Sequence, residues 1–205
     1  MIWALPDSDT YFAPQLARDP RGFEIDHLQI ALKYCTMRRV SVDGGAHIGT
    51  WSRALSDQFL VVMAFEPAPD TYACLIENTR DRENVMQLQQ ALGERSGMGQ
   101  IIDDITRSGN TGSRYIVPGN SIQVVPLDQY KLRTLDFLKL DVEGYELAAL
   151  CGAAETIKRC RPVVMIEVKR LRPGHDPMAA VKYLETMGYC EVERARNDWV
   201  FVKNS

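Results

Sequence analysis

The cysteines of this 205-residue chain form no recognisable framework. There are five, none of them in a C-x-x-C pair, at positions 35, 74, 151, 160 and 190. Disulfide scaffolds need an even set of thiols and cysteine-based metal sites need closely spaced ones. The pattern disfavours both, and reduced thiols in the core are expected.

Long hydrophobic runs and an excess of one charge are also missing. No apolar stretch approaches the roughly 20 residues that span a membrane, and the first seven residues lack the basic flank and apolar run of a signal peptide. The formal net charge is −3, so no global basic field attracts nucleic acid or acidic membranes. We expect a cytoplasmic chain without a membrane partner; a local patch for nucleic acid stays open.

The composition is that of a globular protein, with 45% apolar and 25% charged residues. A length of 205 residues suits one α/β domain. We expect an irregular arm and a helix over residues 1–38, with the helix at 23–37, and a core over 39–205. Within the core we expect a strand over 85–92 and a glycine-punctuated β excursion at about 94–126. This excursion is either a flap over a site or a decorative insertion.

The most informative stretch is a glycine-rich turn at residues 43–49. It joins an apolar strand, residues 40–42, to a helix that begins near Thr50. A second apolar run, residues 60–65, then ends in Glu66. Strand, glycine turn, helix, strand and terminal acid, in this order, are typical of the nucleotide-binding half of a doubly wound α/β fold.

Asp43 at the start of this turn distinguishes between cofactors. A carboxylate here repels the pyrophosphate of a dinucleotide, by about 4 kcal/mol for a close pair at intermediate dielectric. It attracts the ammonium and sulfonium of S-adenosylmethionine (SAM), directly or through water. Gly45 and Gly49 allow the backbone to approach a ligand. Glu66 lies near the offset at which an acid accepts hydrogen bonds from ribose hydroxyls. The pattern therefore favours SAM.

A second strand, residues 137–142, brings three charged side chains to one face. Lys139, Asp141 and Glu143 alternate along it, and the two acids emerge at the carboxyl edge of the sheet, where ligands of open α/β sheets bind. They are candidates for holding the SAM ammonium, for general-base catalysis or for binding a divalent cation. Glu146 is equally well explained as a carboxylate at a helix start.

The remaining elements continue the α/β alternation and end in a hairpin. We expect helices over 146–159 and 177–187, and strands over 163–168, 189–194 and 199–203. The turn at residues 196–198 joins the last two strands. An antiparallel hairpin whose last strand enters the sheet is the arrangement of Rossmann-like methyltransferases.

From about residue 38 to the C-terminus the chain resembles the FkbM-type SAM-dependent methyltransferases. The most specific matching element is Lys-x-Asp-x-Glu-Gly-x-Glu, here residues 139–146. The other matching pieces are residues 43–52, 65–67, Asn78, 91–93 and 162–168. The resemblance implies a Rossmann-like class I methyltransferase fold, with a seven-stranded, mostly parallel sheet and an antiparallel C-terminal hairpin. It also implies O-methylation of a hydroxyl on a sugar or a small natural-product-like acceptor.

The resemblance further implies which residues contact SAM. The glycine turn would hold the methionine moiety, Glu66 the ribose, residues 91–92 the adenine, and Asp141 would lie near the methyl group. The expected cofactor-binding set is Asp43, Gly44, Gly45, Ala46, His47, Gly49, Ser52, Glu66, Pro67, Ala91, Leu92 and Asp141. His47 occupies a position that is often glycine in methyltransferases generally.

A hydroxyl acceptor must also lose its proton to a base that reaches its oxygen. Asp141, Glu143 and His47 are the expected catalytic residues, and His175 is a further candidate on a loop after the fifth strand. His27, on the leading helix, is expected to be an ordinary surface or capping residue.

Glu167 is unusual, because a buried apolar strand seldom carries an unpaired acid. Lys139 or Lys169 is its expected partner, and with Asp141 and Glu143 it is also a candidate Mg²⁺ site. The expected rim of the site carries Arg107, Arg114, Arg170 and Arg172, which either are solvated or attract an anionic acceptor.

Two other functions are compatible with the same sequence. One is methylation of nucleic acid, although the Asn/Asp-Pro-Pro-aromatic motif of amino-group methylation is absent. The other is a SAM-binding regulatory or interaction protein without catalysis. The expected partner of the favoured enzyme is a small-molecule or carbohydrate acceptor.

Overall fold

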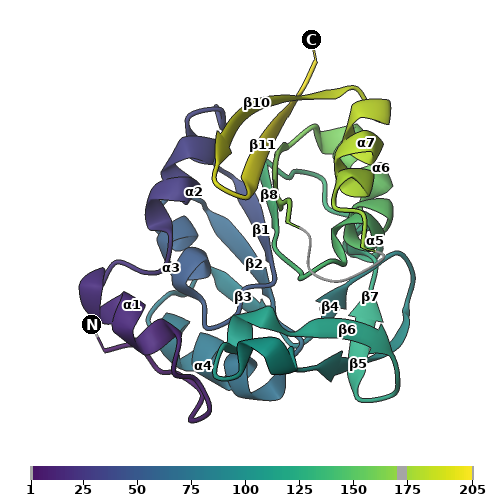
Figure 1. Ribbon diagram of the computed structural model, residues 1–205. Helices are drawn as coiled ribbons and strands as arrows, with labels where there is room; N and C mark the ends of the chain where they lie inside the picture. The colour runs from purple at the N-terminus through teal and green to yellow at the C-terminus, as the bar shows by residue number, and fades with distance from the viewer. Residues whose placement is uncertain (1, 170–174, 205) are drawn as a thin grey trace.

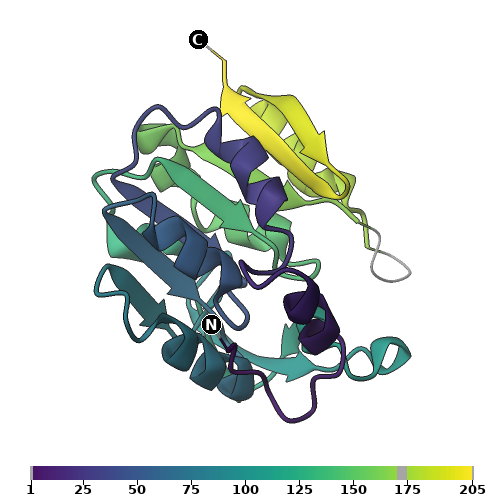
Figure 2. The ribbon, with the colours of Figure 1, turned by 90° about the vertical axis from the view of Figure 1, so that its left-hand side faces the viewer.

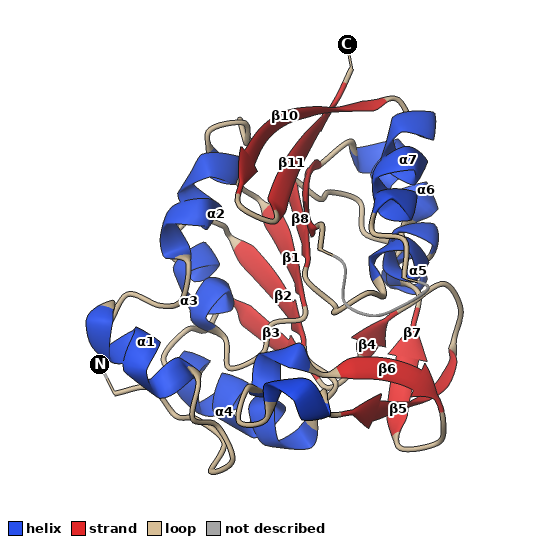
Figure 3. Ribbon diagram, in the orientation of Figure 1, coloured by secondary structure: helices blue, strands red, loops and turns tan. Residues whose placement is uncertain are grey.

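In the computed structural model, which describes residues 2–169 and 175–204, seven strands form the central sheet (Figure 1; Figure 3). They are β1 (Val40–Gly44), β2 (Val61–Phe65), β3 (Val85–Leu88), β8 (Phe137–Leu140), β9 (Val163–Glu167), β10 (Tyr189–Ala195) and β11 (Asp198–Lys203). Their order is β10-β11-β9-β8-β1-β2-β3. The strands from β9 to β3 are parallel, whereas β11 runs antiparallel to both β9 and β10. The expected mostly parallel sheet with a C-terminal hairpin is confirmed.

Helices cover both faces of this sheet (Figure 1). On one face lie α2 (Ile25–Leu32), α3 (Thr50–Ser56) and α4 (Pro69–Thr79), and on the other α5 (Glu146–Cys151), α6 (Ala154–Cys160) and α7 (Met178–Thr186). Each layer has its own apolar core, one around Leu28 and Leu55 and one around Leu150 and Leu184. Successive residues of β2 alternate between these cores, as the pleat of a strand requires. No helix in the described ranges has the length and apolarity needed to cross a membrane.

The β excursion forms a second, four-stranded sheet. Its strands are β4 (Ala91–Leu92), β5 (Gly97–Ile102), β6 (Tyr115–Pro118) and β7 (Ile122–Val125), in the order β4-β7-β5-β6. The short turns η1 (Ile105–Arg107), η2 (Thr111–Ser113) and η3 (Leu127–Tyr130) connect or follow them. The single strand expected over 85–92 is wrong. The backbone turns sharply at Leu88, whose carbonyl accepts the N–H of Gln90 at 2.9 Å, and the chain then enters the second sheet.

The N-terminal arm contains a helix, α1 (Phe12–Arg18), that the sequence did not predict. Asp9 stabilises its start by accepting the N–H of Phe12 at 2.7 Å, although it lies outside the helix. Phe12 and Leu16, one turn apart, pack against Ile48 of the glycine turn. In Figure 2 the arm lies beside the excursion, and the N–H of Thr10 donates to the Gly109 carbonyl at 2.9 Å.

Two other helix boundaries differ from expectation. The helix expected over 23–37 is shorter, because α2 ends at Leu32. The helix expected over 146–159 is two helices, α5 and α6. The chain breaks at Gly152, where a Cβ would stand 1.9 Å from the carbonyl oxygen of Gly93. Gly152 and Ala153 form the turn between the two helices, and glycine fits at 152 beside the backbone of Gly93.

Candidate active site

A cavity of about 400 Å³ lies at the carboxyl ends of the parallel strands. Its described lining comes from the glycine turn, the ends of β2, β8 and β9, the excursion, the N-terminal arm and the turn before β11. Of the residues expected to bind cofactor or catalyse, nine line it: Gly45, Ala46, His47, Glu66, Pro67, Ala91, Leu92, Asp141 and Glu143. The described lining does not include Asp43, Gly44, Gly49 or Ser52.

Asp43 lies beneath the turn, in a buried ion pair. Its carboxylate is 3.0 Å from the Nζ atom of Lys139 and accepts the Ser52 hydroxyl at 2.6 Å. Lys139 also donates to the carbonyl oxygen of Gly45 at 2.8 Å. Burial by itself lowers the pKa of Lys139, but the charges of Asp43 and Asp141 outweigh it, so the net pKa is raised. Through Lys139, the Asp43 carboxylate is thus linked to the backbone of the turn.

Two glycines of the turn are required by close contacts. Gly45 has φ +74°, and a Cβ there would lie 1.9 Å from the carbonyl oxygen of Asp141. Gly49 has φ +87°, and a Cβ there would lie 2.6 Å from Leu75, which fixes how closely α3 approaches α4. A side chain would be strained by the left-handed backbone at either position, and at Gly45 it would also collide with the main chain of Asp141.

Glu66 is held in place at the end of β2 by three hydrogen bonds. Its carboxylate accepts the N–H groups of His47 at 2.8 Å and Ala68 at 2.9 Å, and the hydroxyl of Thr71 at 2.8 Å. Burial raises the pKa of Glu66, and these bonds only partly oppose the rise. A carboxylate has about four acceptor positions, so one remains for a ligand hydroxyl.

His47 connects the glycine turn to the excursion and the arm. Its Nε2 atom lies 2.8 Å from the Thr111 hydroxyl, which lies 2.6 Å from the Asp9 carboxylate. An ionised carboxylate only accepts hydrogen bonds, so the hydroxyl donates to Asp9 and accepts from His47. The Phe12 ring lies 4.5 Å from the imidazole. Burial lowers the pKa of His47 to about 4, which makes it a poor proton acceptor near neutral pH.

Beyond Asp141 the cavity contains an acid cluster with its own cation. Oxygen atoms of Asp141, Glu143 and Glu167 lie within 4.8 Å of one another. The Nζ atom of Lys169 is 3.0 Å from Glu143 and 2.7 Å from Glu167, so Lys169, one of the two predicted partners, is the partner of Glu167. Burial and the nearby Asp141 charge raise the pKa of both glutamates. Within the described part of the chain, the Asp141 carboxylate has no hydrogen bond or ion pair.

Two of these acids, Asp141 and Glu143, lie in a tight turn after β8. Glu143 and Gly144 both have left-handed backbone conformations, with φ of 50° and 92°. The buried Glu146 carboxylate accepts the N–H groups of Val142 and Gly144, both at 3.1 Å. Glu146 is thus a structural residue at the helix start.

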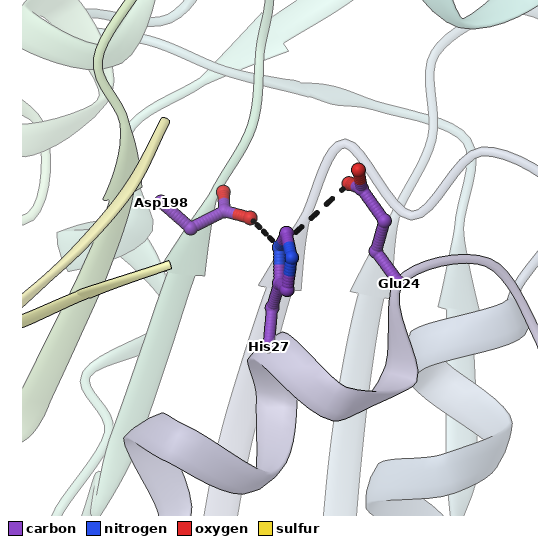
Figure 4. A group of neighbouring side chains, drawn as sticks. All are labelled: Glu24, His27 and Asp198. Atoms are coloured by element: carbon purple, nitrogen blue, oxygen red, sulfur yellow. Dashed lines mark hydrogen bonds and ion pairs between the residues drawn. The ribbon is translucent and has the colours of Figure 1, made fainter. Parts of the chain in front are cut away.

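A second group of charged side chains lines the cavity beside the end of β9 and was not expected. Glu24 at the N-cap of α2, His27 of α2 and Asp198 of β11 converge there (Figure 4). The Nδ1 atom of His27 is 2.7 Å from Asp198 and 3.9 Å from Glu24. The His27 side chain is 16% exposed, so the expectation of an ordinary surface or capping residue is wrong. The hydrogen-bonded pair is 171 residues apart in sequence, and no local pattern signals it.

The predicted arginine rim is partly structural. Arg107 and Arg114 line the cavity. Arg114 also forms a two-pronged ion pair with Asp70, at 2.6 and 2.8 Å, which attaches the excursion to α4. Arg170 and Arg172 lie outside the described residues, and His175 is not among the described lining.

Three comparisons with known proteins bear on this site. Hexuronic acid methyltransferase AglP from Haloferax volcanii is 28% identical over 192 residues, which is 90% of this chain and 77% of that protein. The structure of a methyltransferase FkbM from Methylobacillus flagellatus KT is 20% identical with a TM-score of 0.55. The match covers 82% of this chain and 45% of that one, so this chain spans less than half of its length. A Streptococcus mutans structure in complex with SAH has a TM-score of 0.56 at 10% identity, covering 87% and 94% of the two chains.

These structural likenesses establish a Rossmann-like class I methyltransferase fold. The family model for the methyltransferase FkbM domain matches residues 43–190. That span begins at Asp43 of the glycine turn and includes the acid cluster after β8 and at the end of β9. The chain therefore belongs to the FkbM family of SAM-dependent methyltransferases.

Proposed function

We propose that this chain transfers the methyl group of SAM to a hydroxyl of a carbohydrate acceptor that carries a carboxylate. The observation that carries the proposal is the Asp141 carboxylate, which is free of hydrogen bonds and ion pairs in the described residues and stands between two unlike ends of one cavity. The end near β1 and β2 suits a nucleoside, and the end near β9 and β11 is rich in charged groups. The hexuronic acid methyltransferase relative supports this acceptor class.

At the cofactor end, Glu66 accepts hydrogen bonds from the ribose and the buried Ala91 and Leu92 lie along the adenine. Gly45, Ala46 and His47 border the methionine moiety, and Asp141 binds its ammonium. A carboxylate without an ion-pair partner is suited to binding the ammonium, because the ammonium supplies the positive charge that balances it. Asp43 and Ser52 act indirectly, by holding the turn.

At the acceptor end, Lys169 and Arg196 supply positive charge for the carboxylate of the acceptor. Glu143 and Glu167 orient Lys169 and accept hydrogen bonds from sugar hydroxyls. The enzyme aligns the acceptor oxygen with the methyl carbon for in-line displacement, an arrangement that lowers the barrier by several kcal/mol or more.

The acid cluster does not fit Mg²⁺ while Lys169 is charged. Its ammonium already lies within 3.0 Å of both Glu143 and Glu167 and takes the positive charge that a divalent cation would supply. Methyl transfer to a hydroxyl needs alignment and proton removal, and we propose that this chain achieves both with its own residues.

Calorimetry with SAM, S-adenosylhomocysteine and NAD tests the cofactor. We expect the first two to bind and NAD not to bind; NAD binding without SAM binding would refute the proposal. Transfer of labelled methyl into uronic acid glycosides, neutral sugars, RNA and DNA tests the acceptor, and label in nucleic acid alone would favour the nucleic-acid alternative. SAM binding without any transfer would favour a regulatory binding protein. Asp141→Ala should weaken SAM binding, whereas the exposed-acid control Asp26→Asn should not.

A further inference from the structure

We propose that His27 is the general base that removes the proton from the acceptor hydroxyl, and that Asp198 positions it. The inference rests on the hydroxyl methylation proposed above and adds a catalytic residue to it. It comes from the side-chain group in Figure 4, where His27 lies between Asp198 and Glu24.

The hydrogen bond to Asp198 determines which ring nitrogen of His27 is free. The Asp198 oxygen lies 2.7 Å from Nδ1, and an ionised carboxylate only accepts hydrogen bonds. Nδ1 therefore carries the hydrogen, and in neutral His27 the lone pair is on Nε2. Nε2 has no hydrogen-bond partner in residues 2–169 and 175–204. This is the arrangement by which a carboxylate orients an imidazole for proton abstraction.

The strand order places this pair on the acceptor side of Asp141. Along the carboxyl edge the sequence of strands is β2, β1, β8, β9, β11. Glu66 follows β2 and Asp141 follows β8, so about two strand spacings, or ~10 Å, separate them. Asp198 begins β11, opposite Glu167 of β9, and lies a similar ~10 Å from Asp141 on the other side. With the nucleoside at Glu66 and the ammonium at Asp141, the acceptor is expected near β9 and β11.

The charges around His27 favour the cation that proton transfer creates. Glu24 at the N-cap of the same helix and Asp198 from β11 face the imidazole, while Arg196 lies 3.5 Å from Glu24. Asp141 after β8 and Lys169 after β9 act from farther away. Burial and Asp141 raise the pKa of Asp198 to about 6, which leaves it ionised near neutral pH. The negative charges of Asp198 and Glu24 thus face the positive charge that His27 acquires with the proton.

The step balances without any further reactant. The acceptor O–H bond breaks and its proton forms an N–H bond at Nε2 of His27. The oxygen electron pair forms the new O–CH₃ bond, and the electron pair of the broken C–S bond stays on sulfur, giving S-adenosylhomocysteine. The proton leaves His27 for solvent after product release.

The other candidate bases fit the role less well. His47 donates its Nε2–H to Thr111 and has a pKa near 4. Glu143 is paired with Lys169 at 3.0 Å. Asp141 is the proposed partner of the SAM ammonium. His27 is the histidine in the described lining with both an orienting carboxylate and a free nitrogen.

The test compares His27→Gln, Asp198→Asn and Asp198→Glu with wild type, and uses Asp26→Asn as the matched control on the same helix. Asp26 is 77% exposed and outside the described lining. We expect His27→Gln to lower kcat by about 10²- to 10⁴-fold, the usual contribution of general-base catalysis, with an unchanged SAM Kd. Its residual rate should rise with hydroxide concentration, so that its pH profile differs from that of the wild type. Asp198→Asn should lower kcat without changing KM, and Asp198→Glu should restore part of the loss.

Three results would overturn the proposal in distinguishable ways. Suppose that the wild type methylates a hydroxyl and that His27→Gln keeps the wild-type kcat and pH profile. This result would refute the role of His27 as the base and leave the proposed function standing. Loss of wild-type activity in EDTA, restored by Mn²⁺ and abolished by His27→Gln, would make Glu24, His27 and Asp198 a metal site instead. SAM binding by the wild type without methylation of any hydroxyl would refute the proposed function, and the base role with it.

Discussion

Replacing Lys139 by methionine should destabilise the protein by leaving the Asp43 carboxylate buried without its cation. Asp43 is 0% exposed and the Lys139 side chain 8%, so water cannot take the place of the ammonium. Methionine keeps most of the volume beside the Trp51 ring, which lies 5.4 Å from Nζ. The change therefore removes charge and hydrogen bonds while largely retaining packing.

The expected loss is about 3–5 kcal/mol in the free energy of unfolding, the usual cost of removing one partner of a buried ion pair. For a chain of this size each kcal/mol lowers Tm by about 2–4 °C, so a fall of about 10 °C is expected. The double variant Lys139→Met with Asp43→Asn carries no uncompensated charge and keeps an acceptor for Ser52. It should recover about 2 kcal/mol of the loss, a coupling expected between contacting groups.

Urea unfolding followed by circular dichroism measures these values, with SAM calorimetry on the variants that remain folded. The control is Lys33→Met, which breaks an ion pair with Glu193 of the same 3.0 Å length but with side chains 59% and 31% exposed. Breaking that exposed pair should cost far less than breaking the buried one, because water screens it. SAM affinity close to wild type in the double variant would mean that Asp43 acts through the turn.

A Lys139→Met variant that loses no more stability than the Lys33 control would refute the electrostatic account of the turn. If the two substitutions change the free energy of unfolding additively in the double variant, the pairing of Asp43 with Lys139 is itself refuted. If the double variant is stable but no longer binds SAM, Asp43 contacts the ligand, as the sequence alone suggested.

Three further outcomes can be measured on the same preparation. Gly45→Ala should abolish SAM binding and lower stability, because its Cβ would meet the Asp141 carbonyl oxygen at 1.9 Å; calorimetry showing normal binding would contradict this. Thr111→Val removes the link between His47 and Asp9, so limited proteolysis should cut the N-terminal arm faster than in wild type, and unchanged cutting would contradict it. His47 protonates near pH 4 when folded and near 6.5 when unfolded, so stability should fall by about 3 kcal/mol as pH drops through that window. The His47→Gln variant should lack this part of the fall, and denaturation curves that stay parallel in the two proteins would refute it.

Local patterns in the sequence were sufficient for the parallel core and the cofactor turn. The apolar runs, the glycines and the terminal acids are features of neighbouring residues, and β1, β2, β8 and β9 formed where they were expected. The predicted boundaries of helices were wrong where contacts between residues far apart in the sequence determine them. A predicted helix is interrupted at Gly152, which packs against the backbone of Gly93, and Asp9 and the packing of Phe12 favour a helix in an arm that looked irregular.

The sequence by itself determined the fold class, the SAM-type turn and the family, because these depend on spacing along the chain. Only the tertiary structure decided what each charged side chain contacts. Asp43 pairs with Lys139, His47 with Thr111, and His27 with Asp198 across 171 residues. The physical reason is that strand order and register, and not sequence separation, bring such groups within hydrogen-bonding distance. Burial then determines which charges need a partner, as it does for Asp43 and Lys139.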